Sequence, residues 1–220
     1  MRGPEPLDWD GYCERWSAAH GSYDPRTAPS LVRGWLRLSH ALGTALLRAG
    51  VRSPNAVTSL GLLLSAAVPP VAAFLPGGPF WAAVLVLLSA FADTIDGVLA
   101  VLAGRASRLG QVYDSAADRV SEAAWLLAFA LLGAPVWLTV AAGGAMWLHE
   151  YVRARASIAG MTDIGTVTVA ERPTRVLLTI FGLLATLVEP RASTVTMAAA
   201  LLITVVGFAQ LLRAVRRALR

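Results

Sequence analysis

The chain has 220 residues, of which 56% are hydrophobic and 15% are charged, and its mean hydropathy is +0.59. Soluble domains carry roughly a quarter of charged residues, so this composition excludes an ordinary soluble domain and indicates an integral membrane protein. The formal net charge of +5 does not indicate nucleic acid, because the arginines gather at the ends of apolar segments, where anionic lipid explains them.

Residues 1–29 are predicted to form a polar extension, because they contain acidic residues and tryptophans and lack the short apolar core of a signal peptide. Cys13 is the one cysteine, which excludes an internal disulfide and a cysteine-based metal site. Residues 30–50 carry an apolar stripe at helical spacing, and most of their arginines lie away from it. This pattern predicts an amphipathic helix in the membrane interface. The stripe consists of Leu31, Trp35, Leu38, Leu42 and Leu46.

Six apolar segments follow, and each is predicted to be a membrane-spanning helix. Turn-forming runs such as PGGP at 76–79 separate them. The predicted fold is therefore all-α: an integral membrane protein whose six-helix domain (51–220) is preceded by the interfacial helix. The predicted ranges are 54–75, 80–103, 110–133, 135–158, 174–188 and 193–214.

The placement of arginines predicts the orientation in the membrane. The loops after the first, third and fifth segments carry only Arg191, whereas the opposite side and the C-terminal tail carry many arginines. By the positive-inside rule, the arginine-rich side is cytoplasmic, and so are both termini. We therefore expect a multi-pass protein of the cell membrane.

Four aspartates lie at the predicted cytoplasmic ends of the second and third segments: Asp93, Asp96, Asp114 and Asp118. Ionised carboxylates at membrane depth are costly, which favours a functional site. The first two are spaced i, i+3 and the last two i, i+4, so each pair shares a helix face. Two such faces meeting across a turn would form an oxygen-rich site suited to hard divalent cations. The alternative is that these carboxylates pair with Arg105, Arg108 and Arg119 and only stabilise the helix hairpin.

The stretch resembles the signature of the CDP-alcohol phosphatidyltransferase family, D-x2-D-G-x2-A-R-x8-G-x3-D-x3-D. Every fixed position matches except one, because Val101 stands where the signature has an arginine. The resemblance implies transfer of a phosphatidyl group from a CDP-diacylglycerol-like lipid to a hydroxyl of a small polyol, with release of CMP. It also implies two Mg²⁺ or Mn²⁺ ions, a homodimer and lipid tails that enter between the helices.

The resemblance assigns roles to individual residues. Asp93, Asp96 and Asp114 would be metal ligands, and Asp118 would be both a ligand and the base that takes the proton of the acceptor hydroxyl. Residues assigned to the nucleotide are Asn55, Thr58, Gly97, Ala100, Arg105 and Ser107. Asn55 and Thr58 equally suit a helix cap, and both interpretations stay open. Arg105 lies one helical turn beyond Val101 and is the candidate to replace the missing arginine.

A second group of basic residues is predicted to bind the acceptor. The runs Tyr151-Val152-Arg153-Ala154-Arg155-Ala156 and Glu171-Arg172-Pro173-Thr174-Arg175 are similar to those of actinobacterial phosphatidylinositol-phosphate synthases. The resemblance implies that Arg153, Arg172 and Arg175 hold the phosphate of a phosphorylated polyol. Arg172 and Arg175 also flank a predicted helix N-terminus, which favours an anion. The alternative is that these are ordinary cytoplasmic arginines. Glu122 either extends the acidic site or pairs with an arginine, and His149 is predicted to be an interior histidine without a catalytic role.

Three other functions are compatible with parts of the pattern. A membrane transferase that uses a prenyl diphosphate would usually show two separated acidic motifs, and one acidic cluster is visible here. A non-catalytic member of the same fold would explain Val101. A transporter would need polar residues within several helices, whereas here they lie mainly in two.

Overall fold

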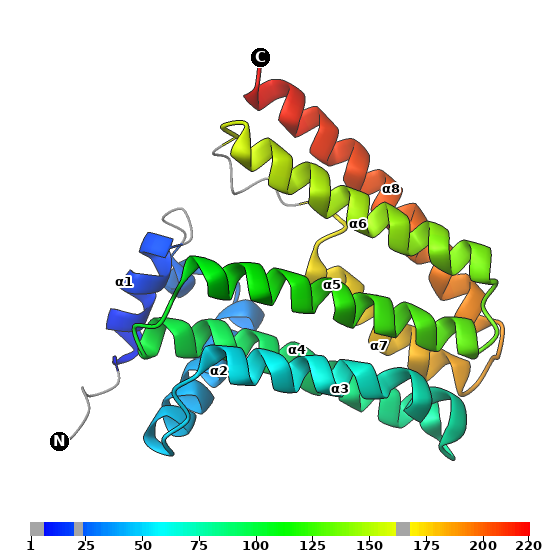
Figure 1. The fold of residues 1–220 in the computed structure, drawn as a ribbon, viewed down its shortest axis with the longest axis horizontal. Helices are drawn as coiled ribbons and strands as arrows, with labels where there is room; N and C mark the ends of the chain where they lie inside the picture. The colour runs from blue at the N-terminus through cyan, green and yellow to red at the C-terminus, as the bar shows by residue number, and fades with distance from the viewer. Residues whose placement is uncertain (1–6, 20–23, 162–167) are drawn as a thin grey trace. The chain divides into compact units, whose positions relative to one another are not determined.

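The computed structural model describes residues 7–19, 24–161 and 168–220, and all regular structure in these ranges is helical (Figure 1). The all-α prediction is therefore confirmed for the described part of the chain. The elements are α1 (Trp9–Ala19), the 3₁₀ helix η1 (Pro25–Thr27), α2 (Ser30–Arg48), α3 (Pro54–Phe74), α4 (Gly78–Leu102), α5 (Arg108–Leu131), α6 (Val136–Ile158), α7 (Arg172–Thr186) and α8 (Ala192–Ala218).

The six helices predicted after residue 50 all form, and each begins within two residues of its predicted start. Three of the helices in the described ranges are long and apolar enough to cross a membrane, namely α3, α4 and α8. The chain thus has the helices of a membrane protein.

Two compact units share these helices. The amino-terminal unit comprises Met1–Gly61 and Ser89–Ala117, and the carboxy-terminal unit comprises Leu62–Leu88 and Asp118–Arg220. Helices α3, α4 and α5 each run from one unit into the other, so each of them has one end in the amino-terminal unit and one end in the carboxy-terminal unit.

Helix α1 was not predicted, because residues 1–29 were expected to be only a polar extension. Its start is capped by Asp8, whose carboxylate accepts a hydrogen bond from the backbone N–H of Gly11 at 2.9 Å. Tyr12 and Cys13 on α1 are completely buried. The composition of the segment hides this helix, because its large apolar residues are few and pack in one cluster.

Helix α2 packs against α4 within the amino-terminal unit. A Cβ atom added at Gly43 would lie 2.8 Å from Cγ1 of Val98, so the two helices approach closely there. The Trp35 indole donates a hydrogen bond to Oγ1 of Thr94 at 3.2 Å, and its ring lies 4.1 Å from that of Phe91, centroid to centroid. Trp35 of the predicted apolar stripe therefore faces α4.

The carboxy-terminal unit has an apolar core around Trp125, Phe129 and Leu183, which are all buried. The Trp125 indole donates a hydrogen bond to Oγ of Ser65 at 3.1 Å. Helices α7 and α8 lie close together at Gly182, where a Cβ atom would lie 2.4 Å from Cγ2 and 2.6 Å from Oγ1 of Thr196. The absence of a side chain at this position lets the two helices meet.

Candidate active site

Acidic side chains of α4 and α5 come together as their spacing predicts. Asp93 and Asp114 each offer a carboxylate oxygen, and these two oxygens lie within 4.8 Å of one another. Asp118 follows one turn later on α5, and its oxygen lies within the same distance of that of Asp114. Clustered carboxylate oxygens are the donors that Mg²⁺ and Mn²⁺ prefer. These residues therefore fit a divalent cation.

Asp96 has different surroundings from the other three aspartates. It is 5% exposed, and its carboxylate accepts a hydrogen bond from the Thr58 hydroxyl at 2.5 Å. The Thr58 hydroxyl also lies 3.2 Å from the carbonyl oxygen of Pro54. Thr58 thus joins the first turn of α3 to α4, an interaction that spacing alone does not predict.

A cavity of about 230 Å³ opens beside Asp96 and Asp114 in the amino-terminal unit. All six residues assigned to the nucleotide line it: Asn55, Thr58, Gly97, Ala100, Arg105 and Ser107. A Cβ atom added at Gly97 would meet nothing within 4 Å, so this wall of the cavity is open. The structure therefore brings the six residues to one place, between the ends of three helices.

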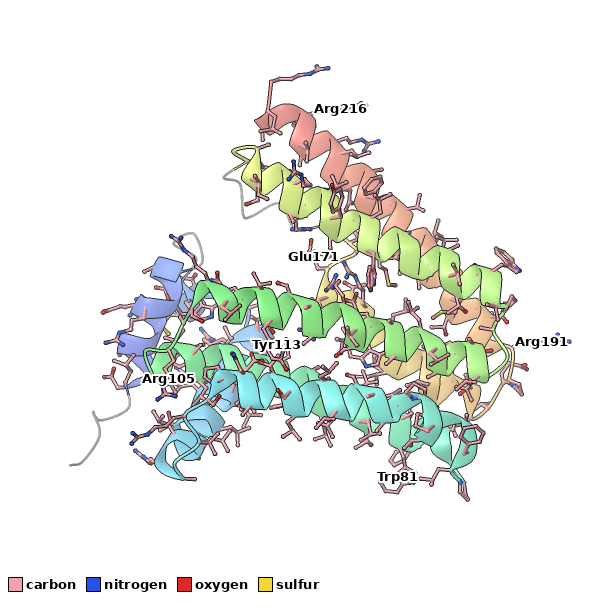
Figure 2. All side chains as sticks on the ribbon, in the orientation of Figure 1. Trp81, Arg105, Tyr113, Glu171, Arg191 and Arg216 are labelled. Atoms are coloured by element: carbon pink, nitrogen blue, oxygen red, sulfur yellow. The ribbon has the colours of Figure 1, made fainter. Side chains whose placement is uncertain are left out.

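The cavity wall also contains Val101, the departure from the family signature. Of the lining residues, Arg105 is the one with a basic side chain, and it lies in the turn between α4 and α5 (Figure 2). Ser107 also caps α5, because its hydroxyl accepts a hydrogen bond from the N–H of Gly110 at 3.0 Å.

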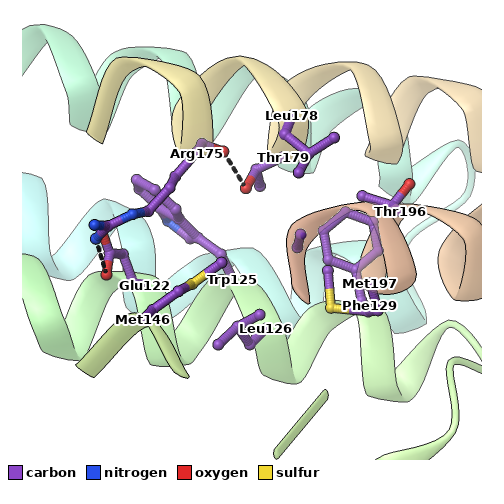
Figure 3. A pocket seen from close by; sticks show the side chains of 11 residues that line it. Glu122, Trp125, Leu126, Phe129, Met146, Arg175, Leu178, Thr179, Thr196 and Met197 are labelled. Atoms are coloured by element: carbon purple, nitrogen blue, oxygen red, sulfur yellow. Dashed lines mark hydrogen bonds and ion pairs between the residues drawn. The ribbon is translucent and has the colours of Figure 1, made fainter. Parts of the chain in front are cut away.

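A network of paired charges occupies the carboxy-terminal unit. Arg175, at the start of α7, is 4% exposed. Its guanidinium contacts Glu122 on α5 at 2.9 Å and Glu150 on α6 at 2.5 Å, and the contact with Glu122 is drawn in Figure 3. Of the two interpretations of Glu122, pairing with an arginine is the one that the structure shows. Buried charges of opposite sign compensate each other here.

Two further arginines complete this network. Arg119 lies 3.3 Å from Glu122 and 3.5 Å from Glu150. Arg172 contacts the Asp118 carboxylate at 2.7 Å. The side chains of Arg119 and Arg172 are each 19% exposed, whereas that of Arg175 is 3% exposed. Of these three arginines, Arg119 and Arg172 are therefore the ones that a solute can reach.

Arg153 lies beside the start of α7, where it pairs with Glu171. The same carboxylate accepts hydrogen bonds from the N–H and the hydroxyl of Thr168, both at 2.9 Å. The Thr168 hydroxyl is also 3.2 Å from Nε2 of His149, which is completely buried, as predicted for an interior histidine. Glu171 thus fastens the segment before α7 to α6.

Two carboxylate partners of these arginines were not predicted from the sequence, namely Glu150 and Glu171. Glu150 directly precedes the run from Tyr151 to Ala156, and Glu171 begins the run that ends at Arg175. Their charge was the available signal, because a buried arginine needs a carboxylate partner. Which carboxylate serves which arginine depends on the packing of α5, α6 and α7.

The described residues combine helices that are long and apolar enough to cross a membrane, clustered carboxylates suited to divalent cations and an adjoining cavity. These features are typical of a metal-dependent membrane enzyme. Residues 51–206 match the family CDP-alcohol phosphatidyltransferase. The chain belongs to this family and is accordingly a transferase of phospholipid biosynthesis, which confirms the resemblance seen in the sequence. The match disfavours both the prenyl diphosphate transferase and the non-catalytic alternatives.

Curated and structural relatives agree with this assignment. The chain is 33% identical over 153 residues to a phosphatidylinositol phosphate synthase of Mycobacteroides abscessus, an alignment that covers 66% of this chain and 68% of the relative. It is 27% identical to a crystal structure of the Mycobacterium tuberculosis phosphatidylinositol phosphate synthase with CDP-DAG bound, with a TM-score of 0.66. That match covers 81% of this chain and 94% of the relative. The structure of that enzyme in complex with manganese and citrate has a TM-score of 0.67 at 27% identity, and the match covers 81% of this chain and 88% of the relative.

Proposed function

We propose that this transferase moves a phosphatidyl group from a CDP-diacylglycerol-like lipid to a hydroxyl of a phosphorylated polyol and releases CMP. The observation that carries the proposal is the grouping of Asp93, Asp114 and Asp118 near the cavity that Asp96 and Asp114 line. The relatives support it, since one solved structure holds CDP-DAG and another holds manganese.

The nucleotide end of the donor would occupy the cavity of the amino-terminal unit. Gly97 and Ala100 leave room for the nucleotide along α4, and Arg105 offers positive charge to its phosphates. Asn55, Thr58 and Ser107 offer polar atoms in the same wall. Thr58 would also orient Asp96 through their hydrogen bond.

The four aspartates would hold two divalent cations, Mg²⁺ or Mn²⁺. When bound, such cations neutralise charge on a diphosphate and stabilise the leaving phosphate oxygen. Asp118 would accept the proton of the acceptor hydroxyl. Its contact with the Arg172 guanidinium would hold the carboxylate in position.

The phosphate of the acceptor would bind near the start of α7. Arg172 and Arg153 flank this helix N-terminus, where the free N–H groups and the helix dipole favour an anion. Arg175 belongs to the same group, and we propose that it acts by holding Glu122 and Glu150 in place, because almost none of its side chain is exposed.

We further propose that all six helices from α3 to α8 cross the cell membrane, with both termini and the active site in the cytoplasm. Helix α2 would lie in the membrane interface, where its exposed Val32, Leu38 and Leu42 would contact lipid. The domain organisation would be an extension over 1–29, the interfacial helix at 30–50 and the membrane domain at 51–220. The functional form would be a homodimer, as the resemblance implies.

Release of CMP tests the proposed function directly. Purified protein with CDP-diacylglycerol and Mg²⁺ is expected to release CMP when the correct acceptor is supplied from a panel of polyols and their phosphates. Asp118→Asn is expected to abolish this release while the protein still inserts into the membrane. Absence of CMP release with every acceptor would refute the proposed reaction, and full turnover by Asp118→Asn would remove the role of Asp118.

A further inference from the structure

Helix α1 covers the last turns of α4 (Figure 1). Tyr12 and Cys13 are completely buried and pack in one apolar cluster with Val98 and Leu102 of α4. Leu7, Trp9 and Trp16 are partly buried and pack against this cluster from the same part of the chain. A helix of 11 residues is only marginally stable by itself. This apolar contact therefore contributes to holding α1 in place.

Helix α2 provides a second support for α1. The ring of His40 lies 5.1 Å from that of Tyr12 and 5.8 Å from that of Trp9, centroid to centroid. His40 Nε2 is also 3.0 Å from the carbonyl oxygen of Leu7, and the Arg37 guanidinium lies over the Trp9 ring. The contacts run from α1 to α2 and from α2 to α4, so α1 belongs to the same packed body as the end of α4.

Val101 lies between the apolar cluster around α1 and the cavity assigned to the nucleotide. It packs against the cluster of Tyr12 and Cys13, and it also lines the cavity assigned to the nucleotide. The family signature has an arginine at this position, and the family match begins at residue 51, beyond α1 and α2. An arginine at 101 would bring its charge beside the apolar cluster, at a cost in desolvation. An apolar residue at 101 therefore suits the docking of α1.

We propose that α1 is a functional part of the nucleotide site: its docking on Val101 fixes the cavity wall, and binding of the CDP group strengthens that docking in return. Val101 is then a positioning residue, and Arg105 supplies the positive charge in this wall. The reciprocity follows from linkage, because an element that favours the bound state is itself favoured by binding. The inference rests on the proposed function in one respect, namely that the cavity holds the nucleotide of a CDP-linked lipid.

Cys13 allows the docking of α1 to be measured without any turnover. It is the one cysteine of the chain, and its side chain is buried in the contact with α4. Its rate of alkylation by N-ethylmaleimide in the full-length protein therefore reports how often α1 leaves α4. The Val101→Arg variant is expected to raise this rate at least about tenfold.

Two matched variants control this measurement. Val101→Leu keeps the apolar contact and is expected to keep the slow rate. Leu109→Arg adds the same charge at the start of α5, where Leu109 is 77% exposed, and is expected to leave the rate unchanged. An unchanged rate in Val101→Arg would overturn the docking role of Val101, and so would an equal rise in Leu109→Arg.

The coupling to the nucleotide is tested on the wild-type protein. CDP-diacylglycerol with Mg²⁺ is expected to slow alkylation of Cys13 about threefold or more, whereas diacylglycerol alone is not. Tyr12→Ala is expected to raise the KM for CDP-diacylglycerol with little change in the KM for the acceptor, and Tyr12→Phe is expected to restore it.

The outcomes separate the two proposals. Normal CMP release with no effect of CDP-diacylglycerol on Cys13 would overturn the coupling and leave the proposed function intact. Absence of CMP release with every acceptor would refute the proposed function, whereas the contrast between wild type and Val101→Arg would still decide whether Val101 holds α1. Equal KM changes for donor and acceptor in Tyr12→Ala would show that α1 has a structural role only and no specific role in nucleotide binding.

Discussion

Two groups of acidic side chains, one in each unit, are arranged in opposite ways. In the amino-terminal unit, Asp93 and Asp114 are grouped with each other, and a cavity opens beside Asp114. In the carboxy-terminal unit, Glu122 and Glu150 are each paired with buried Arg175. Carboxylates close to one another repel unless a cation lies between them, whereas a neighbouring arginine compensates the charge of a buried carboxylate. The first arrangement is therefore suited to chemistry and the second to structure.

Removing one carboxylate from each unit is the strongest test of this comparison. Asp114→Asn is expected to lower CMP release by at least about a thousandfold, because a lost metal ligand removes several kcal/mol of transition-state stabilisation. It should leave thermal stability nearly unchanged, since it relieves repulsion with Asp93. Glu122→Gln is the matched variant and should mainly lower the melting temperature. If both variants lost activity and stability equally, the distinction between the units would be wrong.

Arg175 is expected to have the largest effect on stability. Arg175→Met leaves Glu122 and Glu150 with Arg119 as their remaining arginine partner, and loss of one member of a buried charged group costs about 3–5 kcal/mol. The measurement is thermal unfolding in detergent. Arg216→Met, on an exposed position of α8, is the control and should change the melting temperature little. A tolerated Arg175→Met would show that these charges contribute little to the fold.

The contact between α2 and α4 tests the packing of the amino-terminal unit. Gly43→Ala places a methyl group 2.8 Å from Cγ1 of Val98, whereas the same change at Gly34 meets nothing within 4 Å. Gly34→Ala should be neutral or stabilising, because alanine favours a helix. We expect Gly43→Ala to be less stable than Gly34→Ala by about 1–3 kcal/mol in unfolding experiments. Equal stabilities would show that α2 does not pack closely at Gly43.

The smallest expected effect concerns the pH dependence of Cys13 alkylation. Burial of the side chain raises the pKa of the Cys13 thiol above its usual value. At a given pH the folded protein therefore holds less of the reactive thiolate than an unfolded chain does. The alkylation rate, measured against pH, should still rise where the rate for the urea-unfolded protein has reached its plateau. Coincident profiles would show that the thiol is not perturbed by burial.

The sequence predicts the fold well wherever local rules decide it. Six helices begin near their predicted starts, because apolar length and turn residues define them. Helix α1 was missed because its stability depends on a contact between Tyr12 and Val98, residues that lie far apart in the chain. Average composition over 1–29 does not carry that information.

The site shows the same division between local and distant information. The i, i+4 spacing of Asp114 and Asp118 places both on one face of α5, and this part was predictable. The hydrogen bond between Thr58 and Asp96 joins two helices, and the pair of Glu122 and Arg175 joins two others. Such contacts depend on how the helices pack, so the sequence named Arg175 for the acceptor phosphate without revealing its carboxylate partners.

Direct binding of Mn²⁺ tests the central claim, that the grouped aspartates hold a divalent cation. The number of bound ions is counted by electron paramagnetic resonance of the purified protein, compared with Asp114→Asn and Glu122→Gln. The account predicts that the wild type and Glu122→Gln bind Mn²⁺ equally and that Asp114→Asn loses this binding. Equal binding by wild type and Asp114→Asn, or loss of binding in Glu122→Gln alone, would contradict it.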